Sequence, residues 1–564
     1  MIKKRWQIAK TISTEADQNL IKYPPLLRQI LFNRGFAEEE AATHFLAAFT
    51  PEDHNPFLLS GMEAAVERLE RAIRQSETIV VYGDYDADGV TSSALLVQCL
   101  QVMNGEVRHY IPDRFAEGYG LNVKALRLLK DEGAKVIVTV DCGIRAIPEA
   151  DEAKLLGLDL IITDHHTPGP ELPEAVAIIN SKLEGDDYAN KYLSGVGTAY
   201  KLATALLERS EENEFDSRDL LDLVSLGTIA DLVPLLGENR SLVRQGLERI
   251  RVPRRQGLLS LIGVTGLKAN TLSASDIGFM LGPRINAAGR LGSATDAFKL
   301  LMTSDLFEAG QLAQGLDNRN RERQRLTVEM AEIAEEMIDS EDSEDFLLAA
   351  VRPDFHPGVV GLVASRLADR NYRPAIVGEA GDEFTRVSCR SIPEFNIVEA
   401  LQSCSELFEN FGGHAAAAGF TIKNERLSEA LEQLKALAKD QLGNLDLKPT
   451  LQADVELPLA DLKAELLDQL SLLEPTGYGN PQPQFVSRGL GVRSGKAVGK
   501  DSSHLKLSVS DGRITFDAIA FRQGQWADNL PKEVDLLYRF EINEFNGQKR
   551  LQLNVQDIQA SGEN

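Results

Sequence analysis

The feature that most constrains the fold is the alternation of short apolar strands and helix-patterned segments over residues 78–305. Three runs rich in β-branched residues are typical of buried strands, namely 78–83, 135–140 and 158–163. Segments with helical periodicity, such as 92–100 and 123–133, lie between these runs. Strands that alternate with helices form parallel sheets with helices on both faces. We therefore predict an α/β domain built on a parallel sheet.

Patterns in the rest of the chain predict further domains. A single long helix is expected from about 305 to 338, because Leu326, Met330, Ile333 and Met337 recur at helical spacing before an acidic stretch at 339–345. Near the C-terminus, Asn546-Gly547 separates two alternating runs, which is a strong hairpin signal and predicts a small β-barrel. The predicted domains are a helical cap (1–75), the parallel-sheet domain (76–304), the long helix with its linker (305–345), a smaller α/β domain (346–440) and the barrel (448–562).

Composition narrows the class of protein. No apolar stretch approaches the ~18 residues that a membrane span requires, and the basic start of the chain lacks the apolar segment of a secretory signal. The four cysteines (Cys99, Cys142, Cys389 and Cys404) are far apart in the sequence and form no CxxC pair. This spacing argues against a disulfide framework or a zinc site. We expect a cytoplasmic protein that does not bind membranes, and we interpret Cys142, beside Asp141, as a packing residue.

The net charge of -25 argues against a protein that coats DNA, because phosphate contacts require basic side chains. It does not exclude an enzyme whose positive charge is confined to a groove. Six arginines between residues 240 and 255, and four more in RNRERQR at 319–325, are candidates for such a groove. The alternative for either run is a solvated helix face.

Acidic residues and histidines gather at the carboxyl ends of the predicted strands. They are Asp84, Asp86 and Asp88 after the first strand, Asp141 after the second, and Asp164, His165 and His166 after the third. Ligands of open α/β sheets bind outside the carboxyl ends of the strands, so we expect these side chains at one edge. Asp231, which ends an apolar helical segment at 220–235, is a candidate to join them.

So many like charges would repel one another unless cations hold them together. Mixed carboxylate and imidazole ligation favours Mn²⁺, with Mg²⁺ as the alternative, and several carboxylates suggest two ions, the arrangement used for phosphoester hydrolysis. Each element alone has a simpler interpretation. An aspartate after a strand often caps a helix, and a histidine pair on a loop is often an accident of the surface. Several independent loops that end at the same sheet edge favour the metal site.

The same residues carry a family resemblance. DYDADG (84–89), VDCGI (140–144), TDHH (163–166) and GTIADLVP (227–234) resemble, in order and spacing, the motifs of the DHH phosphoesterases. Further segments resemble the branch of that superfamily that degrades single-stranded DNA from the 5′ end. They include PDRFAEGYGL (112–121), GFMLGPRINAAGRLG (278–292), HPGVVGLVASRL (356–367), FGGHAAAAGF (411–420) and LEPTGYGNPQPQF (473–485).

The resemblance implies a DHH domain and a smaller DHHA1-type domain joined by a long helix, followed by an OB-fold barrel. It also implies a 5′→3′ exonuclease that releases 5′-mononucleotides with two divalent cations, in DNA recombination and repair. The implied metal ligands are Asp84, Asp86, Asp88, Asp141, His165 and Asp231. Asp164 would orient a histidine, and His166 would contact the scissile phosphate or donate a proton to the leaving oxygen. These two roles of His166 remain open.

Arginines in glycine- and proline-rich segments are candidates for bidentate phosphate contacts. With the polar residues beside them, the implied DNA-binding set is Arg114, Arg284, Asn286, Arg290, Arg366, Ser388, Arg390, Gly413 and His414. By analogy with the family, a single-strand-binding protein and a helicase would be partners. Two alternatives stay open, namely a DHH phosphodiesterase of short oligonucleotides or cyclic dinucleotides, which the acidic charge suits, and a non-catalytic replication scaffold.

Overall fold

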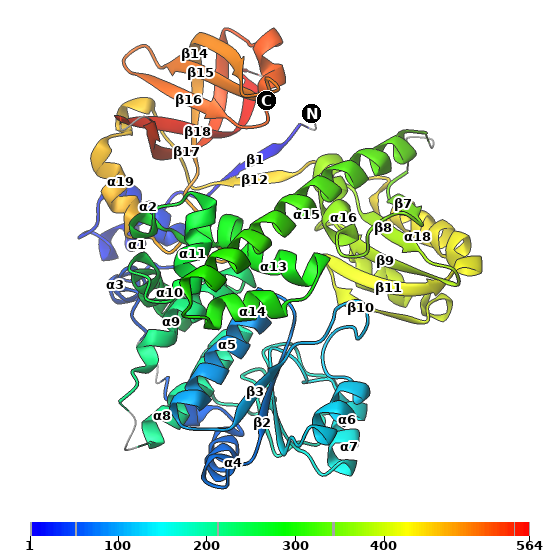
Figure 1. Ribbon diagram of the computed structural model, residues 1–564. Helices are drawn as coiled ribbons and strands as arrows, with labels where there is room; N and C mark the ends of the chain where they lie inside the picture. The colour runs from blue at the N-terminus through cyan, green and yellow to red at the C-terminus, as the bar shows by residue number, and fades with distance from the viewer. Residues whose placement is uncertain (1–2, 51–53, 211–213, 341–344, 546–547, 563–564) are drawn as a thin grey trace. The chain divides into compact units, whose positions relative to one another are not determined.

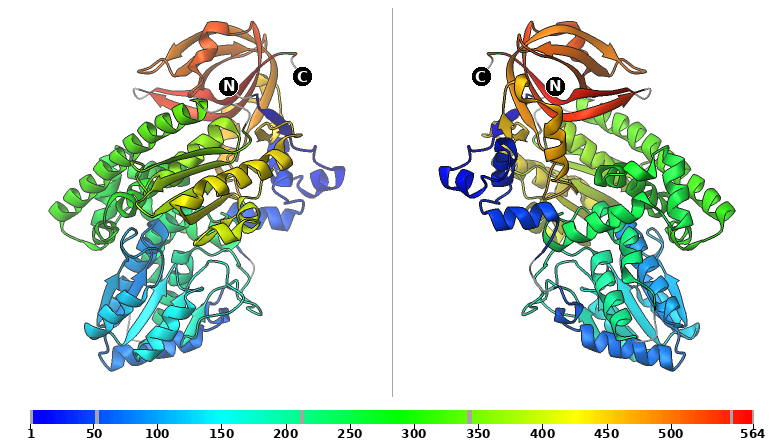
Figure 2. Two further views of the ribbon diagram at one scale, coloured as in Figure 1. Left: turned by 90° about the vertical axis from the view of Figure 1, so that its right-hand side faces the viewer. Right: turned by 90° about the vertical axis from the view of Figure 1, so that its left-hand side faces the viewer.

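The computed structural model describes residues 3–50, 54–210, 214–340, 345–545 and 548–562 (Figures 1 and 2). The chain divides into two compact units. One contains Arg290–Gly292 and Asp317–Leu451 together with the start of the chain, and the other contains Trp6–Gly289, Ser293–Leu316 and Gln452–Asn564. Among the described residues, none of the helices combines the length and the apolar character that a membrane crossing needs.

The larger unit contains the predicted parallel sheet, with strand order β3-β2-β4-β5-β6. The strands are β2 (Ile79–Gly83), β3 (Val107–Tyr110), β4 (Val136–Val140), β5 (Asp159–Thr163) and β6 (Ala177–Ile179). Helices α4 (Met62–Arg74), α5 (Ala87–Val102) and α8 (Gly195–Arg209) share a core with one face, and α6 (Val123–Asp131) and α7 (Ile147–Leu155) share a core with the other (Figure 1). The α/β prediction is confirmed.

A layer of helices extends the first of these cores. It consists of α9 (Leu221–Ala230), α10 (Gly237–Arg251), α11 (Gln256–Thr265), the short α12 (Ala274–Asp276), α13 (Gly282–Leu291) and α14 (Thr295–Met302). Helix α9 is buried along almost its whole length and packs against α5, which brings its C-terminal end toward the carboxyl edge of the sheet.

The C-terminal part of the larger unit is a closed barrel. Its sheet has the order β13-β14-β15-β16-β18-β17, and an additional pairing of β14 with β17 closes it. The strands are β13 (Val455–Glu456), β14 (Phe485–Val498), β15 (His504–Ser510), β16 (Thr515–Ala520), β17 (Glu533–Phe545) and β18 (Gln548–Ala560). The predicted hairpin is formed by β17 and β18, with Phe545 opposite Gln548. The predicted Asn546-Gly547 turn itself lies outside the described residues.

The N-terminal helices belong to two different cores. Helices α2 (Pro25–Asn33) and α3 (Glu39–Ala47) bury Leu27, Ile30 and Phe45 in one cluster with the barrel and with α19 (Ala464–Ser471), and Leu20, directly after α1 (Thr14–Asn19), joins this cluster. Helix α4 instead buries its apolar face against the parallel sheet. The sequence pattern of residues 1–75 predicts helices, but it does not indicate which core each of these helices joins.

The smaller unit has a five-stranded mixed sheet of order β10-β11-β9-β8-β7. The strands are β7 (Leu348–Arg352), β8 (Ala375–Ala380), β9 (Phe384–Arg390), β10 (Asn410–His414) and β11 (Ala417–Lys423), and the helices are α16 (Val360–Asn371), α17 (Ile397–Gln402) and α18 (Leu427–Leu442). The predicted long helix is α15 (Leu306–Ser340), whose residues from Asp317 onward belong to this unit. Most of the predicted acidic linker, 341–344, lies outside the described residues.

Candidate active site

The carboxyl ends of three adjacent parallel strands supply the core of the site. Asp84 follows β2, Asp141 follows β4 and Asp164 follows β5, and all three side chains are buried. Asp141 has a φ of 62°, a left-handed conformation that an L-residue with a side chain adopts at a cost. Its N–H donates to the carbonyl oxygen of Thr163 at 3.1 Å, which ties β4 to β5 at the edge of the sheet.

The first turns of two helices fix the neighbouring acids. Asp86 caps α5, because its Oδ1 accepts the N–H groups of Asp88 and Gly89. Asp88 accepts the N–H groups of Gly195 and Val196 at 2.7 and 2.8 Å, at the start of α8. A Cβ atom at Gly195 would lie 2.6 Å from the Asp141 carboxylate, so only glycine lets α8 begin this close to the strand ends.

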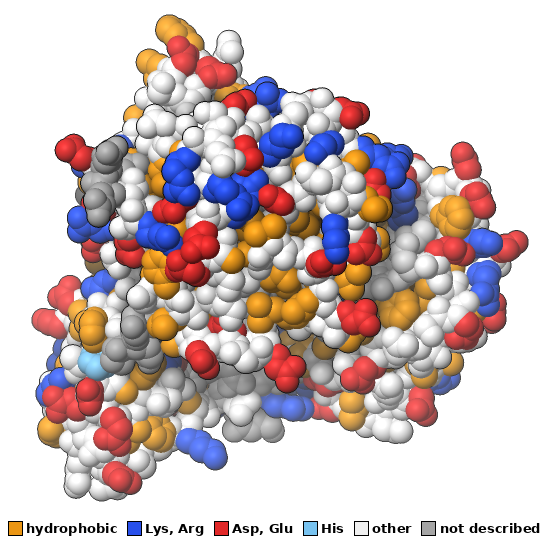
Figure 3. Space-filling model, turned by 90° about the horizontal axis from the view of Figure 1, so that it is seen from below, with side chains coloured by type: hydrophobic (Ala, Val, Ile, Leu, Met, Phe, Trp, Pro, Cys, Tyr) orange, Lys and Arg blue, Asp and Glu red, His pale blue; other side chains and the backbone are white. Residues whose placement is uncertain are grey.

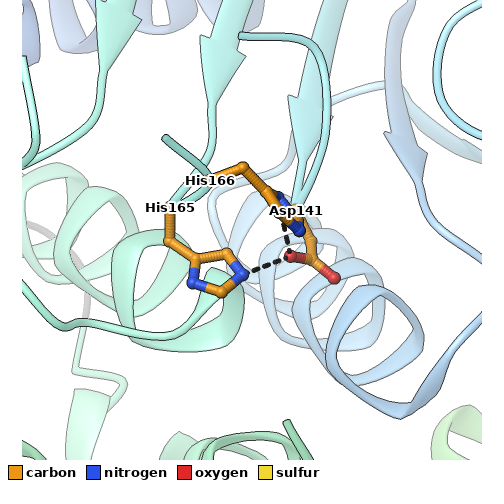
Figure 4. A group of neighbouring side chains, drawn as sticks. All are labelled: Asp141, His165 and His166. Atoms are coloured by element: carbon orange, nitrogen blue, oxygen red, sulfur yellow. Dashed lines mark ion pairs between the residues drawn. The ribbon is translucent and has the colours of Figure 1, made fainter. Parts of the chain in front are cut away.

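The side chains form three overlapping groups of three residues each. Within each group, the ligand atoms lie within 4.8 Å of one another. These groups are Asp84 with Asp86 and Asp141, Asp88 with His165 and Asp231, and Asp141 with His165 and His166. His165 Nε2 lies 3.1 Å from Asp141 Oδ1 and 3.6 Å from Asp231 Oδ2. Figure 4 shows both histidine rings directed at the Asp141 carboxylate. Because the groups share Asp141 and His165, the cluster has the form of a site for two neighbouring cations.

Burial and mutual repulsion change the titration of these groups. Burial, and then the charge of Asp86, raises the pKa of Asp88 to about 7. Burial and the charges of Asp88 and Asp86 raise the pKa of Asp231 to about 9. The pKa of Asp141 also lies well above its usual value, because the carboxylate is buried and faces Asp88. Burial lowers the pKa of His165 to about 3, so its ring is a neutral ligand at neutral pH.

Several buried polar atoms at this edge have no hydrogen-bond partner among the residues that the structure describes. They are Asp84 Oδ1, Asp141 Oδ1 and both ring nitrogens of His165. Buried polar groups are normally satisfied, and leaving one unsatisfied costs about 1–3 kcal/mol. Oxygen and imidazole nitrogen atoms that point into one space are the donor set of Mn²⁺ or Mg²⁺. The residues therefore fit divalent cations.

Asp164 is held in a different way from the other acids. Its Oδ1 lies 2.7 Å from His166 Nδ1 and accepts the N–H groups of His165 and His166, and its Oδ2 accepts the N–H of Ile144. Burial acts to raise the pKa of Asp164, but these hydrogen bonds and the His166 charge outweigh it and lower the pKa. Burial acts to lower the pKa of His166, but the hydrogen bond to Asp164 and the negative charge of Asp164 outweigh it and raise the pKa. Asp164 thus orients His166.

Two of the predicted DNA-binding residues of the larger unit, Arg114 and Asn286, contact the turn before α5 and its first residue. The Arg114 guanidinium lies 4.9 Å from the centre of the ring of Tyr85, the residue that follows Asp84 in the sequence. The Asn286 amide oxygen accepts the N–H of Ala87 at 2.8 Å, so it braces the acidic turn. The buried Arg284 donates to the carbonyl of Met280 within its own helical segment.

The remaining predicted residues belong to the smaller unit. Arg390 and Ser388 lie on β9, and in the sheet register Arg390 is opposite Ala417, which is itself opposite His414. Arg390 Nη1 lies 3.3 Å from Ser388 Oγ. Gly413, in β10, has a φ of 145°. Arg366 is exposed on α16, and Arg290 donates to the carbonyl of Gly358 at 3.2 Å.

The arginines at 240–255 do not form the predicted basic groove. Arg240 is buried and donates to the carbonyl oxygens of Phe45 and of residues 472–475. The other five are paired as well, Arg244 with the Leu46 carbonyl, Arg249 and Arg254 with Asp219, Arg251 with the Leu272 carbonyl, and Arg255 with Asp222. The expectation is therefore wrong for this run, because its charges serve to hold distant segments together.

Two neighbours of the site, Tyr119 and Lys182, were not predicted from the sequence. The Tyr119 hydroxyl lies 3.4 Å from His166 Nδ1 and 3.3 Å from the Asp141 carbonyl oxygen. Lys182 Nζ donates to the His165 carbonyl oxygen at 2.5 Å. Tyr119 falls inside the PDRFAEGYGL motif, which was a usable signal. Lys182 lies on a loop without a pattern. Cys142 is fully buried, and burial raises the pKa of its thiol, in keeping with its interpretation as a packing residue.

Comparisons with known proteins agree with this architecture. Models of three families match the chain, namely the N-terminal domain of the DHH family (residues 78–228), the DHHA1 domain (344–442) and the RecJ OB domain (453–557). The fold and the carboxylate–histidine edge thus define a DHH phosphoesterase. Within that superfamily the chain belongs to the RecJ family.

Relatives that match over nearly the whole chain, and solved structures, support the assignment to the RecJ family. The single-stranded-DNA-specific exonuclease RecJ of Bacillus subtilis is 39% identical over 99% of this chain and 71% of its own length. RecJ of Escherichia coli is 37% identical over 95% and 96%, respectively. The crystal structure of RecJ from Thermus thermophilus in complex with Mn²⁺ matches with a TM-score of 0.84 and 31% identity, over 99% of this chain and 80% of that chain. The family resemblance seen in the sequence is confirmed.

Proposed function

We propose that this protein is a 5′→3′ exonuclease specific for single-stranded DNA, which releases 5′-mononucleotides with the help of two divalent cations. The observation that carries the proposal is the convergence of six potential ligands, Asp84, Asp86, Asp88, Asp141, His165 and Asp231, at one sheet edge. The proposal draws on the names of the full-length relatives, which are single-stranded-DNA-specific exonucleases, and on RecJ structures that contain Mn²⁺ or Mg²⁺.

The cations would be held by those six residues. When bound, two such ions lower the repulsion between phosphate and attacking oxygen and favour departure of the leaving oxygen. The protein's own groups supply the rest. Asp164 raises the pKa of His166 and keeps its ring in place beside the ligands through Nδ1. A proton on the other ring nitrogen, Nε2, would be the one available to the scissile phosphate or to the leaving oxygen. Both roles remain candidates.

Recognition of a 5′-phosphate is assigned to the smaller unit. Helix α16 begins at Val360 without a side-chain cap, so its first N–H groups and its dipole favour an anion. A Cβ atom at Gly361 would lie 2.9 Å from Ser388 Oγ and 3.2 Å from Arg390 Nη2, so both side chains lie directly against this turn. Arg366 on the same helix, with Gly413 and His414 on β10, would complete the recognition of the strand end.

The biological setting follows from the family. We infer a role in recombination and repair in the cytoplasm, where a helicase and a single-strand-binding protein would supply the substrate. All four cysteines are free and buried, which suits a reducing compartment. A phosphodiesterase of short oligonucleotides or cyclic dinucleotides is less well supported, because the closed barrel suits a longer strand. A non-catalytic scaffold would have no need for the complete ligand set.

Substitution of Asp141 by Asn tests the proposal. The side chain belongs to two of the three ligand groups, so its loss should lower kcat on single-stranded DNA by on the order of a hundred- to a thousandfold or more. Strand binding should be largely unchanged. Asp131→Asn, at the exposed end of α6, is the matched control and should retain full activity. Substantial hydrolysis by folded, Mn²⁺-saturated Asp141→Asn protein would refute the assignment.

A further inference from the structure

A cavity lies in the larger unit, and none of its described lining residues belongs to the acidic cluster. Its volume is about 580 Å³, and its walls are mainly apolar. Its lining includes Tyr192, Pro234, Glu238, Tyr478 and Gly479. Tyr192 and Tyr478 are 59% and 63% exposed, which is unusual for aromatic side chains that line a pocket. Two accessible aromatic faces in one cavity form a surface on which a planar group can stack.

The backbone around Tyr478 is built to present this side chain. The N–H of Leu235 donates to the Tyr478 carbonyl oxygen at 2.8 Å. Gly479 has a φ of 76°, and a Cβ atom at Gly477 would lie 2.7 Å from the Leu235 side chain, so the turn packs directly on residues 234–235. The buried Arg240 fixes the preceding segment by binding its carbonyl oxygens. These contacts hold the backbone of the Gly477-Tyr478-Gly479 segment in place while the Tyr478 side chain stays exposed.

Two short stretches of chain connect the lining of the cavity to the acidic cluster. Tyr192 is three residues before Gly195, whose N–H binds Asp88, and Pro234 is three residues after Asp231. Three residues span at most roughly 10–11 Å. The third wall, Tyr478 and Gly479, precedes β14, the first long strand of the barrel. The cavity therefore adjoins segments that lead to the acidic cluster and to the barrel.

The charges around the cavity select against a phosphate. Glu238 lines the wall, but it forms a buried ion pair with Lys201 and accepts the Tyr188 hydroxyl at 2.9 Å. Among the described residues that line the cavity, there is no lysine or arginine. An uncharged planar ligand fits these walls, whereas an anion would meet a carboxylate and no opposing cation. Stacking on an aromatic face does not depend on the identity of the base, so recognition would tolerate different base sequences.

We propose that this cavity binds a nucleobase of the single strand, stacked on Tyr192 and Tyr478, in the stretch between the scissile phosphate and the barrel. The inference rests on the proposed function and adds a specific base-binding subsite to it. Stacking on tyrosine would hold the strand in register without reading its sequence.

An abasic-site scan tests the subsite. Binding of 5′-phosphorylated single strands is measured in EDTA, with one abasic site moved along the strand. For the wild type, an abasic site at the position that reaches the cavity should raise Kd by about five- to a hundredfold. Tyr478→Ala and Tyr192→Ala should each raise Kd for the intact strand by a similar factor and lose sensitivity to that abasic position. Tyr478→Phe should keep it, because the ring remains.

The controls separate this proposal from the proposed function. Leu155→Ala, at a side chain that is 83% exposed on α7, should leave the scan unchanged. An abasic profile that is the same in the wild type and in Tyr478→Ala would overturn the subsite and assign the cavity to another occupant, such as an apolar peptide. A wild type that digests no single strand would instead refute the exonuclease function itself.

Discussion

At the scale of single residues, the raised pKa values of Asp88 and Asp231 link metal binding to pH. With pKa values of about 7 and about 9, Asp88 is partly protonated and Asp231 is largely protonated in the metal-free protein at neutral pH. Because cations require the ionised carboxylates, Mn²⁺ binding should release protons, and its affinity should rise by up to about tenfold per pH unit for each proton released. Calorimetry in buffers of different ionisation enthalpy measures the proton number. An affinity that does not change between about pH 6 and 9 would contradict these pKa values.

The same shifts have a consequence for stability. Both carboxyl groups have folded-state pKa values above their unfolded values, so the metal-free protein loses their contribution as pH rises through about 4 to 9. A bound cation reverses the effect, because it favours the ionised form. The increase in Tm caused by Mn²⁺ should therefore be larger at high pH than at low pH.

Arg390 is the residue on which end recognition depends most directly. If it binds the terminal phosphate, Arg390→Ala should lose about ten- to a hundredfold of the preference for 5′-phosphorylated over 5′-hydroxyl strands. Burial lowers the pKa of Arg390, so an anion beside it is favourable. Arg352→Ala, at an exposed pair with Asp354 in the same unit, is the control. Equal losses on both substrates would mean that Arg390 only braces the sheet.

At the scale of elements, helix α10 connects parts of the chain that are remote in sequence. Arg240 donates to five backbone carbonyl oxygens, one at Phe45 and four in residues 472–475, and its guanidinium lies 4.1 Å from the centre of the Phe45 ring. Arg240→Met would leave these buried acceptors unsatisfied and should destabilise the protein by about 3 kcal/mol or more. Thermal unfolding of this variant and of Arg254→Met, whose side chain is 77% exposed, measures the difference. A normal Tm for Arg240→Met would contradict the bracing role.

The elements that sequence alone predicted are those with local signals. The strands that end at Gly83, Val140 and Thr163 could be recognised because apolar runs and the acids after them are adjacent in the chain. Their meeting at one edge followed from the parallel topology. The partners of Arg240 could not be predicted in this way, since they lie in distant segments. The same holds for Tyr192 and Tyr478, which only the folded chain brings to one cavity.

At the scale of the whole molecule, the acidic net charge is compatible with a DNA substrate. Acidic and basic side chains are interspersed over the face drawn in Figure 3. In the candidate site Asp84, Asp88 and Asp141 are buried, and the pKa values of Asp88, Asp141 and Asp231 are raised, so the formal charge overstates what a strand meets there. Removing the barrel from about residue 448 onward is not a clean test of strand binding, because it would also strip the core that contains Leu27 and Ile30.

We infer that the chain degrades single strands from the 5′ end. Digestion of an end-labelled single strand in Mn²⁺, with a bulky block at either end, tests this polarity. A block at the 5′ end should stop hydrolysis, whereas a block at the 3′ end should leave stepwise release of 5′-mononucleotides intact. Digestion that proceeds past a 5′ block, or that is stopped only by a 3′ block, would contradict the account.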